Sequence, residues 1–157
     1  MKTAVVYYSL NGNCAFVAEE IKAGLNSDLI RLHTKDEKDR KGCAKFFWSI
    51  KVMLSKKPPL KPYTFDPSMY DLIIIGAPVW AGSPASPVKT FISESGIKGK
   101  KIALFVCHAG GMGNALGDLT KLLSSNDIIS EMDINDPKTK DSEGAKQMIA
   151  QWVKTLG

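Results

Sequence analysis

The chain has 157 residues, of which 44% are hydrophobic and 24% charged. That length and composition are typical of one globular domain with its own core, and they exclude a disordered or collagen-like chain. The formal net charge of +5 leaves open a partner with an anionic surface, nucleic acid included. We therefore interpret residues 1–157 as a single domain.

In the first part of the chain, short apolar runs alternate with stretches of helical period. Apolar runs at residues 4–8 and 29–32 predict two strands, and periodic apolar residues at 17–25 and 43–54 predict two helices. The proline-rich stretch at 56–62 predicts an extended linker within the domain, because proline does not continue a helix.

The same alternation continues to the end of the chain. Apolar runs at 72–75, 102–107 and 128–134 predict three more strands. Helices are predicted at 88–92, 116–123 and 145–156. We expect Ser86 and Pro87 to form the cap and first turn of the first of these. Gly96 would end it, and Asp141 or Ser142 would cap the last.

No segment predicts a membrane span or a secretory signal, because the apolar runs are far shorter than the roughly 18 residues that a span needs. The three cysteines are Cys14, Cys43 and Cys107. They are widely spaced and form no C-x-x-C pair, so neither a disulfide framework nor a zinc site is expected. We expect a cytoplasmic protein without a membrane partner.

Alternating strands and helices predict an α/β fold, a three-layer αβα sandwich around a five-stranded parallel sheet. Five strands favour the order 2-1-3-4-5 over the dinucleotide-binding order. In such sheets ligands bind beyond the carboxyl ends of the strands where the order reverses. The loops at residues 9–14, 77–87 and 107–114 are therefore the candidate ligand loops.

The first of these loops runs from a buried strand straight into a helix and carries a hydroxyl, two amides, a thiol and Gly12. Backbone N–H groups at a helix N-terminus form a cradle for phosphate. A plain turn in which Ser and Asn residues cap the helix uses the same residue types, so both interpretations stay open.

The second loop contains three prolines and two glycines, which make it conformationally specified. Trp80 lies in its middle, where an aromatic ring could stack on a planar ligand. Trp80 could equally fold back into the core, since tryptophan is usually mostly buried.

Other phosphate-binding and signalling motifs do not fit these loops. The first loop lacks the Gly-Lys-Ser/Thr end of a nucleoside-triphosphate loop and the G-x-G-x-x-G dinucleotide motif. The third loop is rich in glycine, but Leu116 stands where the last glycine of that motif would be needed. A receiver domain would need acidic residues where this chain has Ser9, Gly76 and Ala77.

In order and spacing, the segments YYSLNGNC, IIIGAPVWAGSPASPV and FVCHAGGMG resemble the flavodoxin family, in its short form, over the whole chain. The resemblance implies a flavodoxin-like fold, non-covalent FMN and one-electron transfer. It implies that three sets of residues bind the cofactor. The first set surrounds the phosphate and comprises Ser9, Leu10, Asn11, Gly12, Asn13 and Cys14. The second lies along the flavin and comprises Ala77, Pro78, Val79, Trp80, Ala81 and Gly82. The third lies beside the pyrimidine end and comprises Cys107, His108, Gly110, Gly111, Met112 and Gly113.

The chain departs from the family pattern at two of these positions. Cys14 stands where the family usually has a hydroxyl residue. Either the backbone supplies the hydrogen bond to phosphate that the hydroxyl would make, or Cys14 is a reactive thiol at a helix N-terminus. Met112 stands where many flavodoxins have a tyrosine, so the second stacking partner is open. His108 is either a solvated loop histidine or a group whose protonation makes the flavin potential depend on pH. The resemblance also implies that the peptide between Ala81 and Gly82 reorients when the flavin is reduced.

Three functions are compatible with these features. An electron carrier needs no catalytic acid, base or nucleophile, since the cofactor does the chemistry, and we expect it to be a monomer or weak dimer. An NAD(P)H-dependent FMN or quinone oxidoreductase on the same fold would need room over the flavin. A flavin-free interaction protein would use the basic segment described next.

The positive charge is concentrated in residues 35–61, which hold nine basic and three acidic side chains. The predicted helix there turns Lys45, Trp48 and Lys51 outward. It is either a solvated helix face or a docking site for an acidic redox partner protein. Docking predicts reduction rates that fall with ionic strength and with charge reversal at Lys45 and Lys51. With the charge confined to one segment, nucleic acid is not expected as a partner.

Overall fold

The computed structural model describes residues 1–35, 37 and 56–157. Its centre is a parallel sheet in the order β2-β1-β3-β5-β6. Its strands are β1 (Thr3–Tyr8), β2 (Asp28–Leu32), β3 (Leu72–Trp80), β5 (Lys101–His108) and β6 (Asp127–Asn135). Counted in chain order, these five strands have the predicted order 2-1-3-4-5, which is therefore confirmed.

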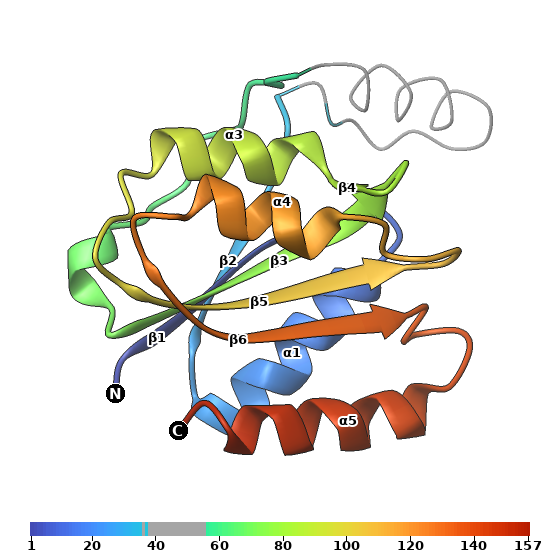
Figure 1. The fold of residues 1–157 in the computed structure, drawn as a ribbon. Helices are drawn as coiled ribbons and strands as arrows, with labels where there is room; N and C mark the ends of the chain where they lie inside the picture. Colours follow the sequence, from blue (N-terminus) through green and yellow to red (C-terminus); the bar gives the residue numbers. More distant parts are fainter. Residues whose placement is uncertain (36, 38–55) are drawn as a thin grey trace.

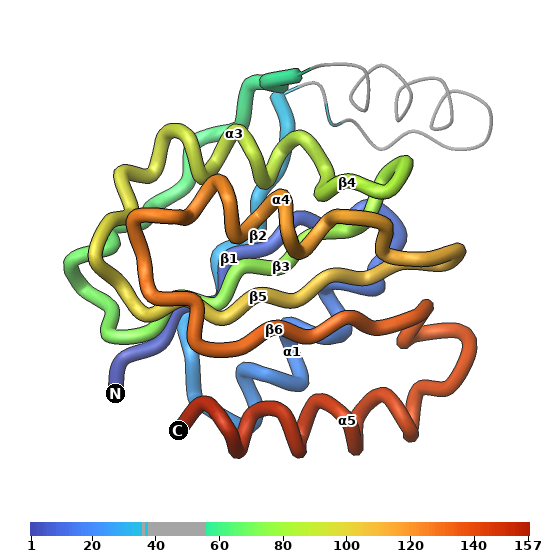
Figure 2. Tube along the Cα trace, viewed as in Figure 1, coloured from blue at the N-terminus to red at the C-terminus, as the bar shows by residue number. Residues whose placement is uncertain are grey.

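Helices cover both faces of the sheet, as Figures 1 and 2 show. On one face lie α1 (Asn13–Leu25) and α5 (Ser142–Lys154), and on the other lie α3 (Ser86–Glu94) and α4 (Ala115–Leu122). A short 3-10 turn, η1 (Pro67–Met69), precedes β3. The predicted αβα sandwich is confirmed. The helix predicted over residues 43–54, with Lys45, Trp48 and Lys51, lies outside the described residues.

Burial follows the apolar pattern of the strands. Every residue of β1 is buried, as are the first six of β3, because helices cover both faces of these central strands. The outer strands β2 and β6 carry exposed residues between less exposed ones. Two apolar clusters result, one between the sheet and α3 and α4, the other between the sheet and α1 and α5. The sheet is thus fixed firmly enough to position the loops at its carboxyl edge.

The N-cap residues predicted from the sequence are confirmed for α5 but not for α3. Asp141 is the N-cap of α5, and its Oδ1 accepts a hydrogen bond from Gly144 N at 2.9 Å, as expected for one of the two candidate caps. The Ser86 cap predicted for α3 is wrong by one residue, since Ala85 is the N-cap and Ser86 already belongs to the helix. Pro87 permits this start, because a first-turn N–H has no acceptor within the helix.

Strand β3 is longer than predicted, because it continues through residues 77–80, which the sequence analysis assigned to a loop. It then turns back as β4 (Ser83–Pro84), an antiparallel partner that the sequence analysis did not predict. Ala81 and Gly82 form the two-residue turn, with φ of 48° and 76°. Two positive φ values are those of a type I′ hairpin turn, in which a residue other than glycine or asparagine is strained.

Replacing Ala81 by glycine is expected to raise the free energy of unfolding by up to about 1 kcal/mol, because the strain of a left-handed alanine exceeds the entropy that glycine costs. Urea unfolding at equilibrium measures the change. The matched control is Ala23→Gly in α1, where the same chemical change should lower stability by about 1 kcal/mol. If Ala81→Gly and Ala23→Gly lowered the free energy of unfolding equally, the turn at Ala81 would not be strained.

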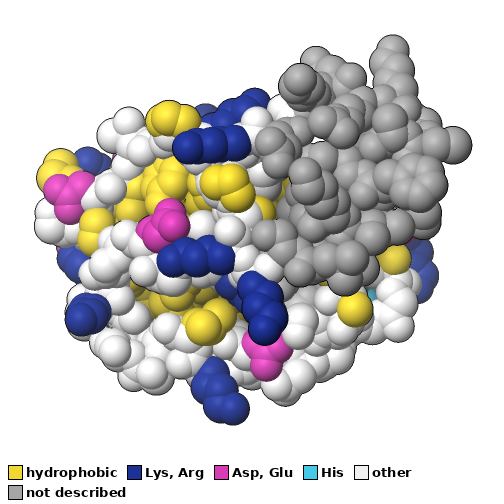
Figure 3. Space-filling view, turned by 90° about the horizontal axis from the view of Figure 1, so that it is seen from above, with side chains coloured by type: hydrophobic (Ala, Val, Ile, Leu, Met, Phe, Trp, Pro, Cys, Tyr) yellow, Lys and Arg dark blue, Asp and Glu magenta, His cyan; other side chains and the backbone are white. Residues whose placement is uncertain are grey.

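Within the ranges described, no helix is long and apolar enough to cross a membrane. Seen from above, the molecule presents lysine and arginine side chains scattered among apolar and acidic ones on its α3 and α4 side (Figure 3). Of the basic segment, only Lys35, Glu37 and residues 56–61 are described. The predicted docking of an acidic partner there stays a prediction.

Candidate functional site

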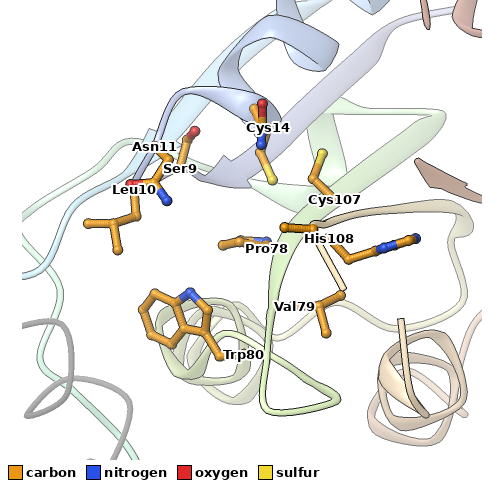
Figure 4. A pocket seen from close by; sticks show the side chains of 11 residues that line it. Ser9, Leu10, Asn11, Cys14, Pro78, Val79, Trp80, Cys107 and His108 are labelled. Atoms are coloured by element: carbon orange, nitrogen blue, oxygen red, sulfur yellow. The ribbon is translucent and has the colours of Figure 1, made fainter. Parts of the chain in front are cut away.

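A cavity opens at the carboxyl ends of β1, β3 and β5, where the three predicted loops meet (Figure 4). It has about 460 Å³ of empty space and is open to solvent. Ten of the predicted site residues line it, namely Ser9, Leu10, Asn11, Asn13, Cys14, Pro78, Val79, Trp80, Cys107 and His108. The topology therefore assembles one site from segments about 100 residues apart in the chain.

The first loop, Ser9 to Cys14, ends at the N-terminus of α1 with unpaired backbone donors. Gly12 is the N-cap, with a φ of 92°. Ser9 Oγ accepts a hydrogen bond from Ala15 N at 3.2 Å, so Ser9 does cap the helix. Within the described residues, the N–H groups of Asn13 and Cys14 have no hydrogen-bond partner. The capping interpretation therefore holds for Ser9. A helix N-terminus with free donors favours an anionic ligand, so the phosphate cradle stays a prediction that these donors support.

Trp80 is half-buried and lines the cavity, as Figure 4 shows. It is not a core residue. The fully buried ring of Tyr8 meets it edge-on, with ring centroids 5.7 Å apart at an angle of 88°. Burial raises the pKa of Tyr8, whose hydroxyl has no hydrogen-bond partner in the described part of the chain. Trp80 thus packs against the core on Tyr8 and borders the cavity, where an aromatic ring can stack on a planar ligand.

Two cysteines lie side by side at the cavity (Figure 4). Cys14 and Cys107 are only 1% and 3% exposed. Burial, together with the neighbouring Cys107 thiol, raises the pKa of the Cys14 thiol well above its ordinary value. Cys14 is therefore a protonated thiol at neutral pH, which disfavours the reactive-thiol interpretation.

Cys14 is expected to react with iodoacetamide at pH 8 at least tenfold more slowly in the folded protein than in guanidinium, because each unit of raised pKa lowers the thiolate fraction tenfold. Peptide mass spectrometry reads Cys14 and Cys107 separately. Equal labelling rates in the folded and unfolded protein would show that the thiol is ionised and accessible after all.

Both ring nitrogens of His108 are occupied. Gly111 N donates to Nδ1 at 3.1 Å, which leaves the proton on Nε2, and Nε2 lies 3.3 Å from Asp133 Oδ2. The histidine thereby holds the third loop in shape and joins it to β6. The predicted dependence of a flavin potential on His108 stays a prediction.

The remaining predicted residues do not line the cavity, and most of them shape the loops instead. They are Gly12, Ala77, Ala81, Gly82, Gly110, Gly111, Met112 and Gly113. Ala77 is fully buried in the core of the sheet. Residues 110–113 are exposed, and Gly113 packs against the backbone of Gly82 in the hairpin turn. Asn114 N also donates to Gly82 O at 2.9 Å, which ties the second loop to the third.

The peptide between Ala81 and Gly82 has no hydrogen bond in the structure at its carbonyl oxygen or its N–H. Nothing in the described residues therefore holds it in one orientation. Its predicted reorientation remains a prediction that this geometry allows.

Three residues outside the predicted loops contact the site. Ala109, which lies inside the predicted third loop, also lines the cavity. Asp136 and Lys138 reach the first loop from the segment after β6, where Asn13 Nδ2 donates to Asp136 Oδ1 at 2.9 Å. Arg31 of β2 donates from Nη2 to Ser9 O at 3.1 Å. The segment after β6 could have been found, because it leaves the same carboxyl edge of the sheet as the three loops that were chosen.

No group of histidine, cysteine and acidic side chains in the described part of the chain is arranged to hold a metal ion. Of the residues that line the cavity, Cys14, Cys107 and His108 are the ones that can titrate, and none of them is placed as a free base. The arrangement is suited to binding an anion and a planar ring rather than to acid–base chemistry.

Solved structures resemble the chain, whereas no curated protein sequence matches it. A flavoprotein from Lactobacillus acidophilus NCFM, solved in complex with FMN, is 25% identical with a TM-score of 0.71, over 90% of this chain and 97% of that one. A flavodoxin from Megasphaera elsdenii is 19% identical with a TM-score of 0.63, over 98% and 99% of the two chains. A WrbA-like flavodoxin from Agrobacterium tumefaciens is 20% identical with a TM-score of 0.61, over 98% and 95%.

The last two likenesses show the fold alone. The flavodoxin family model matches residues 2–156, nearly the whole chain, and the three loops that suggested the family lie together at one cavity. The chain belongs to the flavodoxin family.

Proposed function

We propose that this protein binds FMN in the cavity and carries electrons one at a time between redox partner proteins. One observation carries the proposal: the unpaired N–H groups of Asn13 and Cys14 and the indole of Trp80 border the same cavity. A phosphate and a planar ring on one ligand would satisfy both features. The FMN complex of the Lactobacillus acidophilus flavoprotein supports this choice of ligand.

The residues present fit both ends of FMN. At the phosphate end, free backbone donors stand at the start of a 13-residue helix with no acidic side chain in its first turn. At the ring end, Trp80 offers a face, and Pro78 and Val79 add apolar lining. The described residues that line the cavity include no lysine, arginine or carboxylate.

The cavity favours a carrier because its side chains offer no acid–base or nucleophilic group. The thiol of Cys14 stays protonated, and His108 uses both ring nitrogens to shape the third loop. When bound, FMN supplies the redox chemistry. The chain's part is to hold the phosphate, orient the ring against Trp80 and limit the access of water.

An alternative is an NAD(P)H-dependent FMN or quinone oxidoreductase on the same fold. It is favoured by the third loop, whose residues 109–114 are all exposed, with Met112 37% exposed and no tyrosine among the lining residues. An exposed loop without a tyrosine is compatible with room for a second planar ring beside the first.

The first experiment identifies the cofactor. The purified protein is expected to be yellow, or to become so when apoprotein is titrated with FMN, and the flavin extracted from it should co-migrate with FMN. Trp80→Ala should weaken FMN binding about tenfold or more, because stacking on an aromatic ring contributes one to a few kcal/mol. Met148→Ala, on an exposed position of α5, is the control. Failure of the wild type to bind FMN would refute the proposal.

The second experiment separates the carrier from the enzyme. The carrier should be reduced slowly by NAD(P)H alone and rapidly once a partner reductase is added. Steady NAD(P)H oxidation with a quinone, at undiminished rate without any partner, would favour the oxidoreductase.

A further inference from the structure

A lysine far along the chain reaches the first loop. A Cβ atom built on Gly12 would lie 3.3 Å from Lys138 Nζ and 3.7 Å from its Cδ. The end of the Lys138 side chain therefore rests against the loop at the point where α1 begins. Two features of this turn favour glycine: the close approach of Lys138, and a φ of 92° at residue 12, which lies in the left-handed region.

The backbone around Lys138 is anchored to the same loop. Lys138 N donates to Asn13 Oδ1 at 3.3 Å, and Asn13 Nδ2 donates to Asp136 Oδ1 at 2.9 Å. Asp136 N donates in turn to His108 O at 2.8 Å. The side-chain oxygen and nitrogen of Asn13 thus both bond to the segment that carries Lys138. These bonds hold the Lys138 backbone near the start of α1, whatever the lysine side chain does.

The Lys138 ammonium forms no ion pair with any carboxylate that the structure describes. The carboxylate two residues away, Asp136, accepts hydrogen bonds from Asn13 and Thr139. The other cation near the loop, Arg31, donates to Ser9 O at 3.1 Å. Among the residues that the structure describes, Lys138 therefore offers a charged end that remains available at the start of α1.

We propose that Lys138 binds the ligand's phosphate and selects a phosphorylated flavin over its dephosphorylated form. The inference rests on the proposed binding of FMN. The loop itself supplies neutral donors, and its last residue, Cys14, is a buried thiol. The ammonium adds the positive charge that these neutral donors lack, which strengthens its hydrogen bond to a dianion.

The test compares FMN with riboflavin on apoprotein, with flavin fluorescence as the readout. In Lys138→Gln the Kd for FMN should rise about tenfold or more, as for loss of a hydrogen bond to a charged group, and the Kd for riboflavin should not change. Its FMN affinity should also depend less on salt than that of the wild type. Lys138→Arg should restore most of the affinity. Lys140→Gln, in the same exposed segment, should behave as the wild type.

Two outcomes would overturn the inference. Equal FMN affinity in Lys138→Gln and Lys140→Gln would show that the ammonium does not contact the phosphate. An equal loss for FMN and riboflavin would show that Lys138 only supports the loop. The wild type alone tests the proposed function: if it binds neither flavin, FMN binding itself is refuted before any variant is compared.

Discussion

Replacing Gly113 by alanine is expected to weaken FMN binding at least tenfold and to lower the free energy of unfolding by about 1–3 kcal/mol. The new Cβ would lie 2.5 Å from Gly82 Cα and 2.6 Å from Gly82 O, both backbone atoms of the hairpin turn. Gly113 also has a φ of 54°, which strains alanine whatever the space. The second and third loops would have to separate, and the cavity lies between them.

The matched control is Gly110→Ala in the same loop. A Cβ there meets nothing within 4 Å, and its φ is outside the left-handed region. Urea unfolding and FMN titration of both variants give the comparison. If Gly113→Ala behaves like Gly110→Ala, the close approach of the two loops does not exist in solution.

A second large loss of stability is expected when Gly76, in the middle of β3, is replaced by alanine. A Cβ there would overlap the ring of Phe105 on the neighbouring strand, whose Cε2 would be 2.6 Å away. Phe105 is fully buried, so the ring has no space into which to move. Gly76→Ala should therefore destabilise the protein by about 3 kcal/mol, the upper end for an overpacked core.

A second substitution separates overpacking from an effect on the strand itself. Phe105→Leu removes the ring that the new methyl group meets, so the double variant should be more stable than the sum of the two single losses predicts, by about 1 kcal/mol or more. Thermal or urea unfolding of all four proteins measures this coupling. Strictly additive losses would contradict it.

The sheet could be predicted from sequence because each strand carries its own signal. Residues 4–8 and 102–107 are apolar without interruption, and such runs indicate strands covered on both faces. The end of β3 could not be predicted, because Pro78 breaks the strand pattern. Pairing of β1 with β3 ends at Gly76 and pairing of β4 with β3 begins at Val79, so Pro78 lies between two partner strands, where its missing N–H costs no ladder bond.

The site was predictable to the extent that it follows from the carboxyl ends of the central strands. Ser9, Trp80 and His108 were found in this way. Lys138 was not found, because nothing in its local sequence distinguishes it from the other lysines, although its segment leaves the same edge of the sheet. Its proximity to Gly12 depends on how the segment after β6 docks on Asn13, which is a tertiary contact without a sequence pattern.

The bond between Asn13 and Asp136 joins residues 123 positions apart. A ribosome that has completed α1, β2 and β3 has therefore made the first two loops, but the last group that braces the first loop is still to be synthesised. Since α1 also packs against α5, both supports of the first loop come from residues more than 100 positions further along the chain. The first loop should accordingly reach its final shape only after Asp136 and α5 have been synthesised and have folded against α1.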